Sequence, residues 1–318
     1  MLHEFVDMNG NMHDYEMFGA EQWNAAVDVV MLAYNHEKYI TQAIESILMQ
    51  KTDYTYHIVI GEDCSTDKTR DIIQEYYRKY PDKITLFLWK QNVGADINSL
   101  VLLQSLKSDY VAVLEGDDYW TDERKLEKQI SFLEADETYI ATGHNVICVS
   151  DTGDLLHRDF GFYPIKDEHI YGFEKAKRFE LAAQTASLVY RNFLKDWNEI
   201  QWKSFFQCKA NGDKKISILL GLQGDVFIMR DIMAAHRRVF AGDSWTAKTT
   251  GRNLFWITYQ FHKSIQQCVT EIFRMKISLE DNYKALYKAS CIEFMENPNK
   301  DNFKVLYKMY REKKKSAK

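Results

Sequence analysis

The chain has 318 residues and carries 41 lysines and arginines against 46 aspartates and glutamates, a net charge of −5. This mild acidity argues against a nucleic acid partner. The five cysteines are an odd, scattered set without a Cys-x-x-Cys pair, which argues against a disulfide framework or a thiolate zinc site. No apolar run approaches the length of a membrane span, and the first residues are acidic rather than signal-like, so we expect a cytoplasmic protein.

Strands and helices alternate along the first half of the chain. Short apolar runs rich in β-branched residues predict buried strands at 27–34, 57–60, 84–88 and 110–114. Apolar residues at helical spacing predict helices over 39–48, 72–80 and 97–106, with Asn35 as a candidate N-cap of the first. Because this alternation requires crossover connections, it predicts an open α/β layer fold with a mainly parallel sheet.

Polar residues follow the predicted strands, at the sheet edge where ligands bind in such folds. The most acidic of these turns is Glu115-Gly116-Asp117-Asp118. Crowded carboxylates are costly unless protonation or a cation relieves them, and such hard oxygen ligands suit Mg²⁺ or Mn²⁺ together with substrate phosphates. Since no dinucleotide-binding or Walker glycine motif occurs, the pattern favours a metal-bridged nucleoside diphosphate. A solvated acidic turn is the alternative.

Several ordered segments resemble family 2 glycosyltransferases of the GT-A fold. They are residues 29–50, 60–69, 92–94, 110–120 and 125–129, and the resemblance covers roughly residues 27–150. The family's usual Asp-Asp-Gly-Ser-Thr-Asp is Glu-Asp-Cys-Ser-Thr-Asp here, at 62–67. The resemblance implies a Rossmann-like, mainly parallel sheet flanked by helices. Residues 252–311 lack the family's core motifs, and their apolar positions predict a C-terminal helical extension.

The resemblance also implies a nucleotide site at the ends of the first strands. Tyr34 would pack against the base and Asp63 would hydrogen-bond it, while Ala33 and Asn35 would line the base pocket. Asn92 joins this nucleotide-binding set. For each of these residues taken alone, the alternative to nucleotide binding is an ordinary structural role.

The acidic turn would be the family's metal-binding element. Asp118 is the expected ligand of Mn²⁺ or Mg²⁺, and Asp117 is shared between the ribose and the metal. Glu115 and Trp120 are further candidates, and Trp120 is expected to pack beside the site rather than to react.

The second half of the chain is expected to hold the acceptor and the catalytic base. Residues 184–192, which include Thr185, resemble the strand that closes the sugar pocket. Asp213, at the start of a predicted helix, is the candidate general base, because an attacking hydroxyl must lose its proton. An ordinary helix N-cap is the alternative for Asp213.

The resemblance weakens after residue 234. The family's histidine has no clear counterpart, since His236 stands early and Val239 occupies the expected position. Arg237 and Arg238 are candidates for phosphate binding or, equally, a surface arginine pair. Trp245 lies in the segment that aligns with the loop over the nucleotide.

Three segments are predicted along the chain: an N-terminal arm over 1–24, a glycosyltransferase domain over 25–250, and a helical extension with a basic tail over 251–318. The domain divides into a nucleotide-binding half, 25–125, and an acceptor half, 126–250. The C-terminal helices offer a surface for homo-oligomer formation. The basic tail offers peripheral contact with the inner face of a membrane, with a solvated terminus as the alternative.

The predicted function is metal-dependent transfer, with inversion, of a sugar from a nucleoside diphosphate donor to a hydroxyl of a glycan or lipid-linked acceptor, in bacterial surface polysaccharide synthesis. A UDP-sugar is the favoured donor. Two alternatives stay open: a sugar-phosphate nucleotidyltransferase, which normally needs an early glycine-rich phosphate loop, and an inactive glycan-binding or scaffold protein on the same fold.

Overall fold

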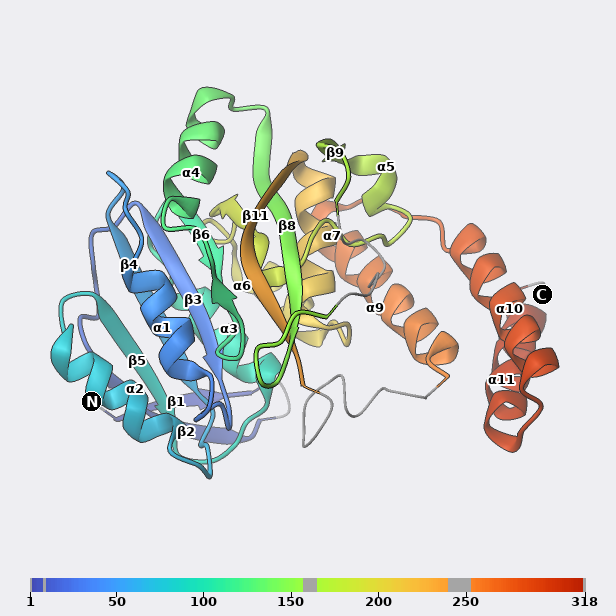
Figure 1. Cartoon of the computed structure of the whole chain (residues 1–318). Helices are drawn as coiled ribbons and strands as arrows, with labels where there is room; N and C mark the ends of the chain where they lie inside the picture. Colours follow the sequence, from blue (N-terminus) through green and yellow to red (C-terminus); the bar gives the residue numbers. More distant parts are fainter. Residues whose placement is uncertain (1, 8–9, 157–164, 240–252, 317–318) are drawn as a thin grey trace.

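The computed structural model describes residues 2–7, 10–156, 165–239 and 253–316 (Figure 1). Its centre is one mixed sheet, in which the order of the nucleotide half is β5-β4-β3-β6. These four strands are parallel, as predicted: β3 is Val27–Ala33, β4 is Tyr56–Glu62, β5 is Ile84–Trp89 and β6 is Tyr110–Val113. The mainly parallel α/β sheet expected from the sequence is confirmed.

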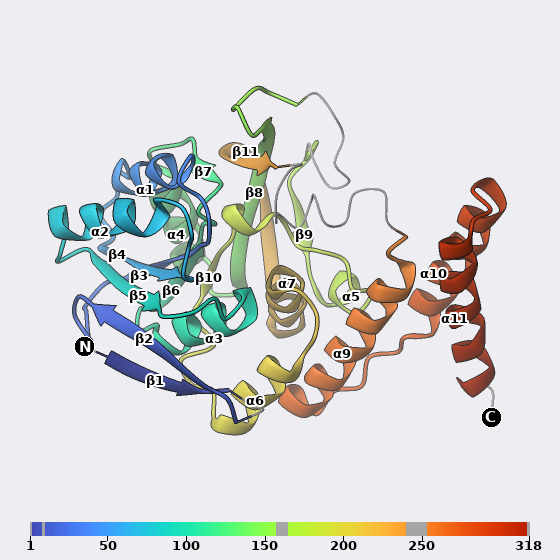
Figure 2. The same cartoon turned by 90° about the horizontal axis from the view of Figure 1, so that it is seen from below.

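Helices cover both faces of this sheet (Figure 2). Helices α1 (Ile40–Leu48), α2 (Thr69–Lys79) and α4 (Lys125–Ala135) pack on one face, and α3 (Ala95–Ser105) packs on the other. The prediction of Asn35 as the N-cap of α1 is wrong, because Tyr39 occupies that position. Asn35 instead adopts a left-handed conformation with φ 56°, in the turn that precedes the helix.

The segment predicted as an N-terminal arm, 1–24, contributes two strands to the sheet. Strands β1 (Leu2–Val6) and β2 (Met12–Phe18) form an antiparallel hairpin, and β2 pairs with β5. The ring of Tyr15 lies 5.5 Å from that of Phe87 and 5.0 Å from that of Trp89, measured between centroids. Contacts with a strand some seventy residues away therefore order the arm, and local periodicity does not reveal them.

The acceptor half extends the same sheet across the predicted boundary at 125–126. Strand β10 (Val189–Arg191) lies antiparallel between β6 and the long strand β8 (Tyr139–Ser150). Strand β11 (Asp225–Arg238) runs parallel to β8 and also pairs with the short strands β7 (Tyr119–Trp120) and β9 (His169–Tyr171). The remaining elements of this half are α5 (Phe173–Ala176), the 3₁₀ turn η1 (Thr185–Ser187), α6 (Glu199–Gln207) and α7 (Gly212–Gln223).

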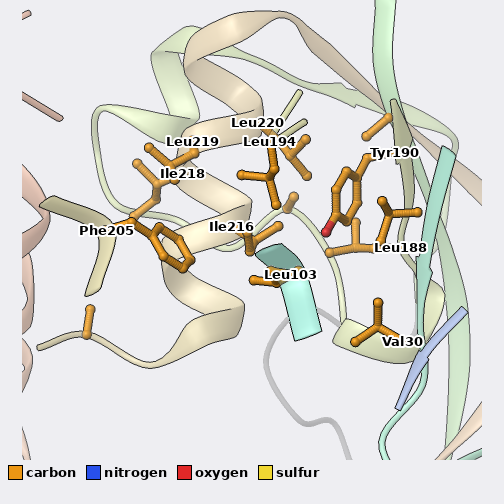
Figure 3. Close-up of a cluster of buried hydrophobic side chains, with 14 of the residues drawn as sticks. Val30, Leu103, Leu188, Tyr190, Leu194, Phe205, Ile216, Ile218, Leu219 and Leu220 are labelled. Atoms are coloured by element: carbon orange, nitrogen blue, oxygen red, sulfur yellow. The ribbon is translucent and has the colours of Figure 1, made fainter. Parts of the chain in front are cut away.

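Buried apolar side chains join the two halves on the α3 side of the sheet. Figure 3 shows Val30 and Leu103 of the nucleotide half facing Tyr190, Phe205 and Ile216 of the acceptor half. Burial of this continuous core is the main term that holds the halves together, at about 25 cal/mol for each Å² of apolar surface removed from water.

Three helices follow the sheet, in the region where helices were predicted: α9 (Phe255–Phe273), α10 (Glu280–Glu296) and α11 (Lys300–Ser316). Helix α9 contributes Ile265, Cys268 and Val269 to the core. Helices α10 and α11 form a hairpin that projects away from the sheet (Figures 1 and 2). In the part of the chain that the structure describes, no helix is both long and apolar enough to cross a membrane.

Candidate active site

The loops after β3, β4 and β6 meet at one edge of the sheet. The backbone N–H of Asp63 donates to the Ala33 carbonyl at 3.0 Å, and that of Gly116 donates to the Leu32 carbonyl at 3.0 Å. The predicted nucleotide-binding and acidic segments therefore lie side by side, as expected for the carboxyl ends of parallel strands.

Asn35 ties the loop after β3 to the loop after β4. Its Oδ1 accepts a hydrogen bond from the Thr66 backbone N–H at 2.8 Å, and its own N–H donates to Ser65 Oγ at 2.9 Å. Tyr34, which precedes it, is half-buried, and Ala33 is buried at the end of β3. The structure thus gives Asn35 a loop-joining role, while contact of these three residues with a base stays a prediction.

Asp63 organises the loop after β5, which leads into α3. Its Oδ1 accepts from the Val93 N–H at 2.7 Å and its Oδ2 from the Gly94 N–H at 2.9 Å, while Asn92 Nδ2 donates to the Asp63 carbonyl at 3.2 Å. Gly94, with φ 83°, is the residue from which α3 starts. Burial raises the pKa of Asp63 to about 6, although the two backbone N–H groups favour its ionised form. The structure therefore brings Asp63 and Asn92 together, and contact of either residue with a nucleotide stays a prediction.

The acidic turn after β6 carries three carboxylates within four residues, Glu115, Asp117 and Asp118. Burial is the largest of the causes that raise the pKa of Glu115 well above its usual value. The negative charges of Asp117, Asp118 and Asp213, in that order, raise it further. Burial also raises the pKa of Asp117, with a further increase from Asp118 and opposing contributions from His36 and His236. Such repulsion is what a divalent cation would relieve, so the chemistry of these donors fits the predicted Mn²⁺ or Mg²⁺. Within the described ranges, however, no three His, Cys, Asp or Glu side chains are already arranged to hold a metal ion.

Asp118 is buried and held by three donors from the acceptor half. Its Oδ1 accepts from the Arg237 backbone N–H at 2.7 Å. Its Oδ2 accepts from Gln184 Nε2 at 2.8 Å and lies 3.2 Å from His236 Nδ1. Burial lowers the pKa of His236, but attraction to Asp118 outweighs burial, so the net pKa is raised. This carboxylate thus joins β11 and the segment before η1 to the nucleotide half.

Sequence reasoning missed Gln184 and His236 as members of the site. Both stand in segments with a family resemblance, but the resemblance alone places the histidine near position 239. The pairing of β11 with β8 and β7 decides the register that brings the His236 ring to Asp118. A histidine at a strand end was the available signal, whereas nothing in the sequence singles out Gln184.

Arg237 is buried in a set of protein contacts. Its Nε donates to the Asp117 carbonyl at 2.9 Å, and its two terminal nitrogens donate to the carbonyls of Ser150 and Asp151 and to Gln42 Oε1. The guanidinium carbon lies 4.7 Å from the ring centre of Tyr39. These contacts indicate a structural arginine, so phosphate binding by Arg237 is a prediction that they do not support.

The other lower-ranked candidates take different positions. Trp120 is buried, and its Nε1 donates to the Ala186 carbonyl at 3.0 Å, so it packs beside the site. Thr185 opens η1, and Arg238 is the last residue of β11. Trp245 lies outside the described residues.

Asp213 lies in the first turn of α7, as predicted, and is half-buried. Its Oδ1 accepts from the Lys214 N–H at 2.7 Å, while the N-cap position itself belongs to Asn211. The charge of Asp213 is the smallest of the causes that raise the pKa of Glu115, after burial and the charges of Asp117 and Asp118. The role of Asp213 as general base stays a prediction.

Comparison with known proteins identifies the family of the chain. The model of the family described as "Glycosyl transferase family 2" matches residues 28–198. The uncharacterized protein Rv1520 of Mycobacterium tuberculosis is 30% identical over 237 residues, covering 73% of this chain and 64% of that protein. TuaG of Bacillus subtilis, named for teichuronic acid biosynthesis, is 34% identical over 131 residues, covering 41% of this chain and 51% of TuaG. The match thus spans less than two thirds of the length of these curated relatives.

The fold has a counterpart among solved structures. The structure of S. aureus TarS in complex with UDP-GlcNAc superimposes with a TM-score of 0.61 at 16% identity, covering 89% of this chain and 79% of the TarS chain. A likeness at this identity concerns the fold alone. Since the family model covers more than half of its residues, the chain belongs to glycosyl transferase family 2.

Proposed function

We propose that this protein transfers a sugar from a nucleoside diphosphate sugar to a hydroxyl of a glycan or lipid-linked acceptor, in the synthesis of a cell-surface polysaccharide. The observation that carries the proposal is the acidic turn after β6, where the buried Asp118 accepts hydrogen bonds from Gln184 and the Arg237 N–H of the acceptor half. The named role of TuaG in teichuronic acid biosynthesis supports a polysaccharide product.

The proposed donor site is the edge formed by the loops after β3, β4 and β6. Tyr34 would stack on the base, and Asp63, already oriented by the Val93 and Gly94 N–H groups, would accept a hydrogen bond from it. The TarS complex with UDP-GlcNAc, which has the same fold, supports a UDP-sugar as donor.

Asp117 and Asp118 would hold Mn²⁺ or Mg²⁺. When bound, such a cation neutralises the negative charge that develops on the departing nucleoside diphosphate. The chain's own part is to keep Asp118 in place: Gln184, His236 and the Arg237 N–H all bind this carboxylate.

Asp213 would accept the proton of the acceptor hydroxyl as its oxygen attacks the anomeric carbon. A single base with direct displacement leads to inversion at that carbon. General-base catalysis of this kind contributes roughly 10²- to 10⁴-fold to a rate.

Calorimetric titration of UDP, GDP and dTDP, with and without Mn²⁺, tests the donor site. One of the three should bind more tightly with Mn²⁺, and D117N should lose that enhancement. If none binds under either condition, the proposal fails. A donor screen that measures nucleotide release then identifies the sugar.

A further inference from the structure

Helix α11 exposes a row of aromatic side chains. Phe303, Tyr307 and Tyr310 are 54%, 50% and 41% exposed, and their i, i+4, i+7 spacing places them along one side of the helix. The rings of Phe303 and Tyr307 are stacked, with centroids 6.3 Å apart. Met295, near the end of α10, is 71% exposed. Large apolar side chains gathered on one surface mark an interaction site more often than scattered ones do.

A neighbouring side of α11 is anchored to α10 and to the turn between the two helices. Asn302 and Met309 are buried, and Asn302 Nδ2 donates to the Asn297 carbonyl at 2.9 Å. Tyr283 of α10 donates its hydroxyl to the Met309 carbonyl at 2.6 Å. These contacts fix the rotation of the helix. The Phe303 ring also packs against Phe294 of α10, with centroids 5.9 Å apart, and the rest of the aromatic row stays open to solvent.

A column of basic residues runs beside the aromatic row. Lys304, Lys308 and Arg311 follow the three aromatic positions by one residue each and are exposed. The Arg311 guanidinium carbon lies 6.0 Å from the ring centre of Tyr307. The helix sequence holds seven lysines and arginines against Asp301 and Glu312. Of these two acidic residues, Asp301 pairs with Lys304 at 3.2 Å and Glu312 pairs with Lys263 of α9 at 2.8 Å.

We propose that the outer face of α11 binds the surface of an anionic lipid membrane. Aromatic rings favour the depth of the lipid headgroups, and neighbouring lysines and arginines pair with anionic headgroups while their stems cover apolar surface. The chain as a whole has a net charge of −5, whereas the sequence of α11 has an excess of positive charge. The inference goes beyond the proposed function and does not rest on it.

Co-sedimentation with vesicles tests the inference. The full chain should sediment with vesicles of phosphatidylcholine and phosphatidylglycerol at low salt, should not sediment with phosphatidylcholine alone, and should be released by high salt. The variants K304E/K308E/R311E and F303S/Y307S should each weaken partitioning by about tenfold or more, since each basic residue near an anionic surface adds roughly fivefold. The matched control I200S/K203E changes an exposed apolar and an exposed basic residue on α6 and should bind as the wild type does.

Two results would overturn the inference. In one, the wild type fails to bind anionic vesicles, or both α11 variants bind as well as it does. In the other, light scattering shows a wild-type oligomer that F303S/Y307S dissolves, which would make the face an interface between copies of the chain. Circular dichroism checks that the variants are folded. Titration with UDP in solution should be unaffected in them, so a failure of membrane binding is distinguishable from a failure of the proposed transferase function.

Discussion

Gln184 connects Asp118 to the backbone of the acceptor half. Its Nε2 donates to Asp118 Oδ2 at 2.8 Å, and its Oε1 accepts from the Ala186 N–H at 2.6 Å. The amide is buried and therefore has one orientation in which both groups are satisfied. Its position relative to Asp118 is consequently determined by the η1 turn.

Loss of the Gln184 donor should impair the site without unfolding the protein. In Q184E the oxygen that accepts from Ala186 is kept, but a carboxylate replaces the donor facing Asp118. We expect about 10- to 100-fold weaker Mn²⁺-dependent UDP binding, the usual cost of losing a group that orients a metal ligand. Calorimetry with and without Mn²⁺ measures the effect, and Q223E on α7 is the matched control. Equal binding by Q184E and wild type would refute the positioning role.

Replacing Asp213 should separate binding from chemistry. D213N keeps the acceptor oxygen for the Lys214 N–H but cannot take a proton, so transfer should fall by roughly 10²- to 10⁴-fold. UDP affinity should stay within about twofold of the wild type, because Asp213 lies outside the predicted nucleotide-binding set. Steady-state kinetics and UDP titration provide the two readings, with the exposed Asp196→Asn as control. Retained turnover in D213N would exclude this residue as the base.

Arg237 should contribute to stability through its buried contacts. A lysine cannot reach the Asp117, Ser150 and Asp151 carbonyls together with Gln42, so R237K leaves buried acceptors unpaired. We expect the free energy of unfolding to fall by roughly 2–4 kcal/mol in urea denaturation. The exposed Arg230→Lys is the control and should change it by less than about 0.5 kcal/mol. A comparably small change in R237K would contradict the structural role.

Acid should destabilise the fold through His57. Burial lowers the pKa of His57 to about 4, where its ring stacks on Trp23 at 4.4 Å and its Nε2 lies 2.9 Å from Thr85 Oγ1. His57 takes up a proton near pH 6.5 in the unfolded chain but only near pH 4 in the folded protein. Its contribution to the free energy of unfolding is therefore complete above about pH 6.5. As the pH falls toward 4, this contribution is lost and the free energy of unfolding decreases by roughly 3 kcal/mol.

Urea denaturation between pH 4 and pH 7 measures that dependence. H57Q removes the ionisable group and should flatten the slope relative to the wild type. His262, whose pKa burial lowers to about 3, should leave a residual slope of the same sign. An unchanged slope in H57Q would show that other groups govern the acid sensitivity.

The sequence by itself determined the strand and helix alternation, the parallel nucleotide half and the family. Apolar runs at 27–34 and 110–114 are local patterns that a buried parallel strand requires, and the turns after them carry polar side chains because loops at a sheet edge contact ligand and water. Asp63, Asn92 and the acidic turn could be predicted for this reason.

Tertiary structure decided the partners of those residues. The N-terminal hairpin is ordered by its pairing with β5. His236 reaches Asp118 because β11 lies beside β8 and β7, and Gln184 reaches it because the following strand β10 lies between β6 and β8. Likewise, Arg237 is a structural residue because its acceptors come from the strand β8, the turn after it and helix α1. Contacts between residues more than fifty positions apart depend on packing and register, for which local periodicity holds no signal.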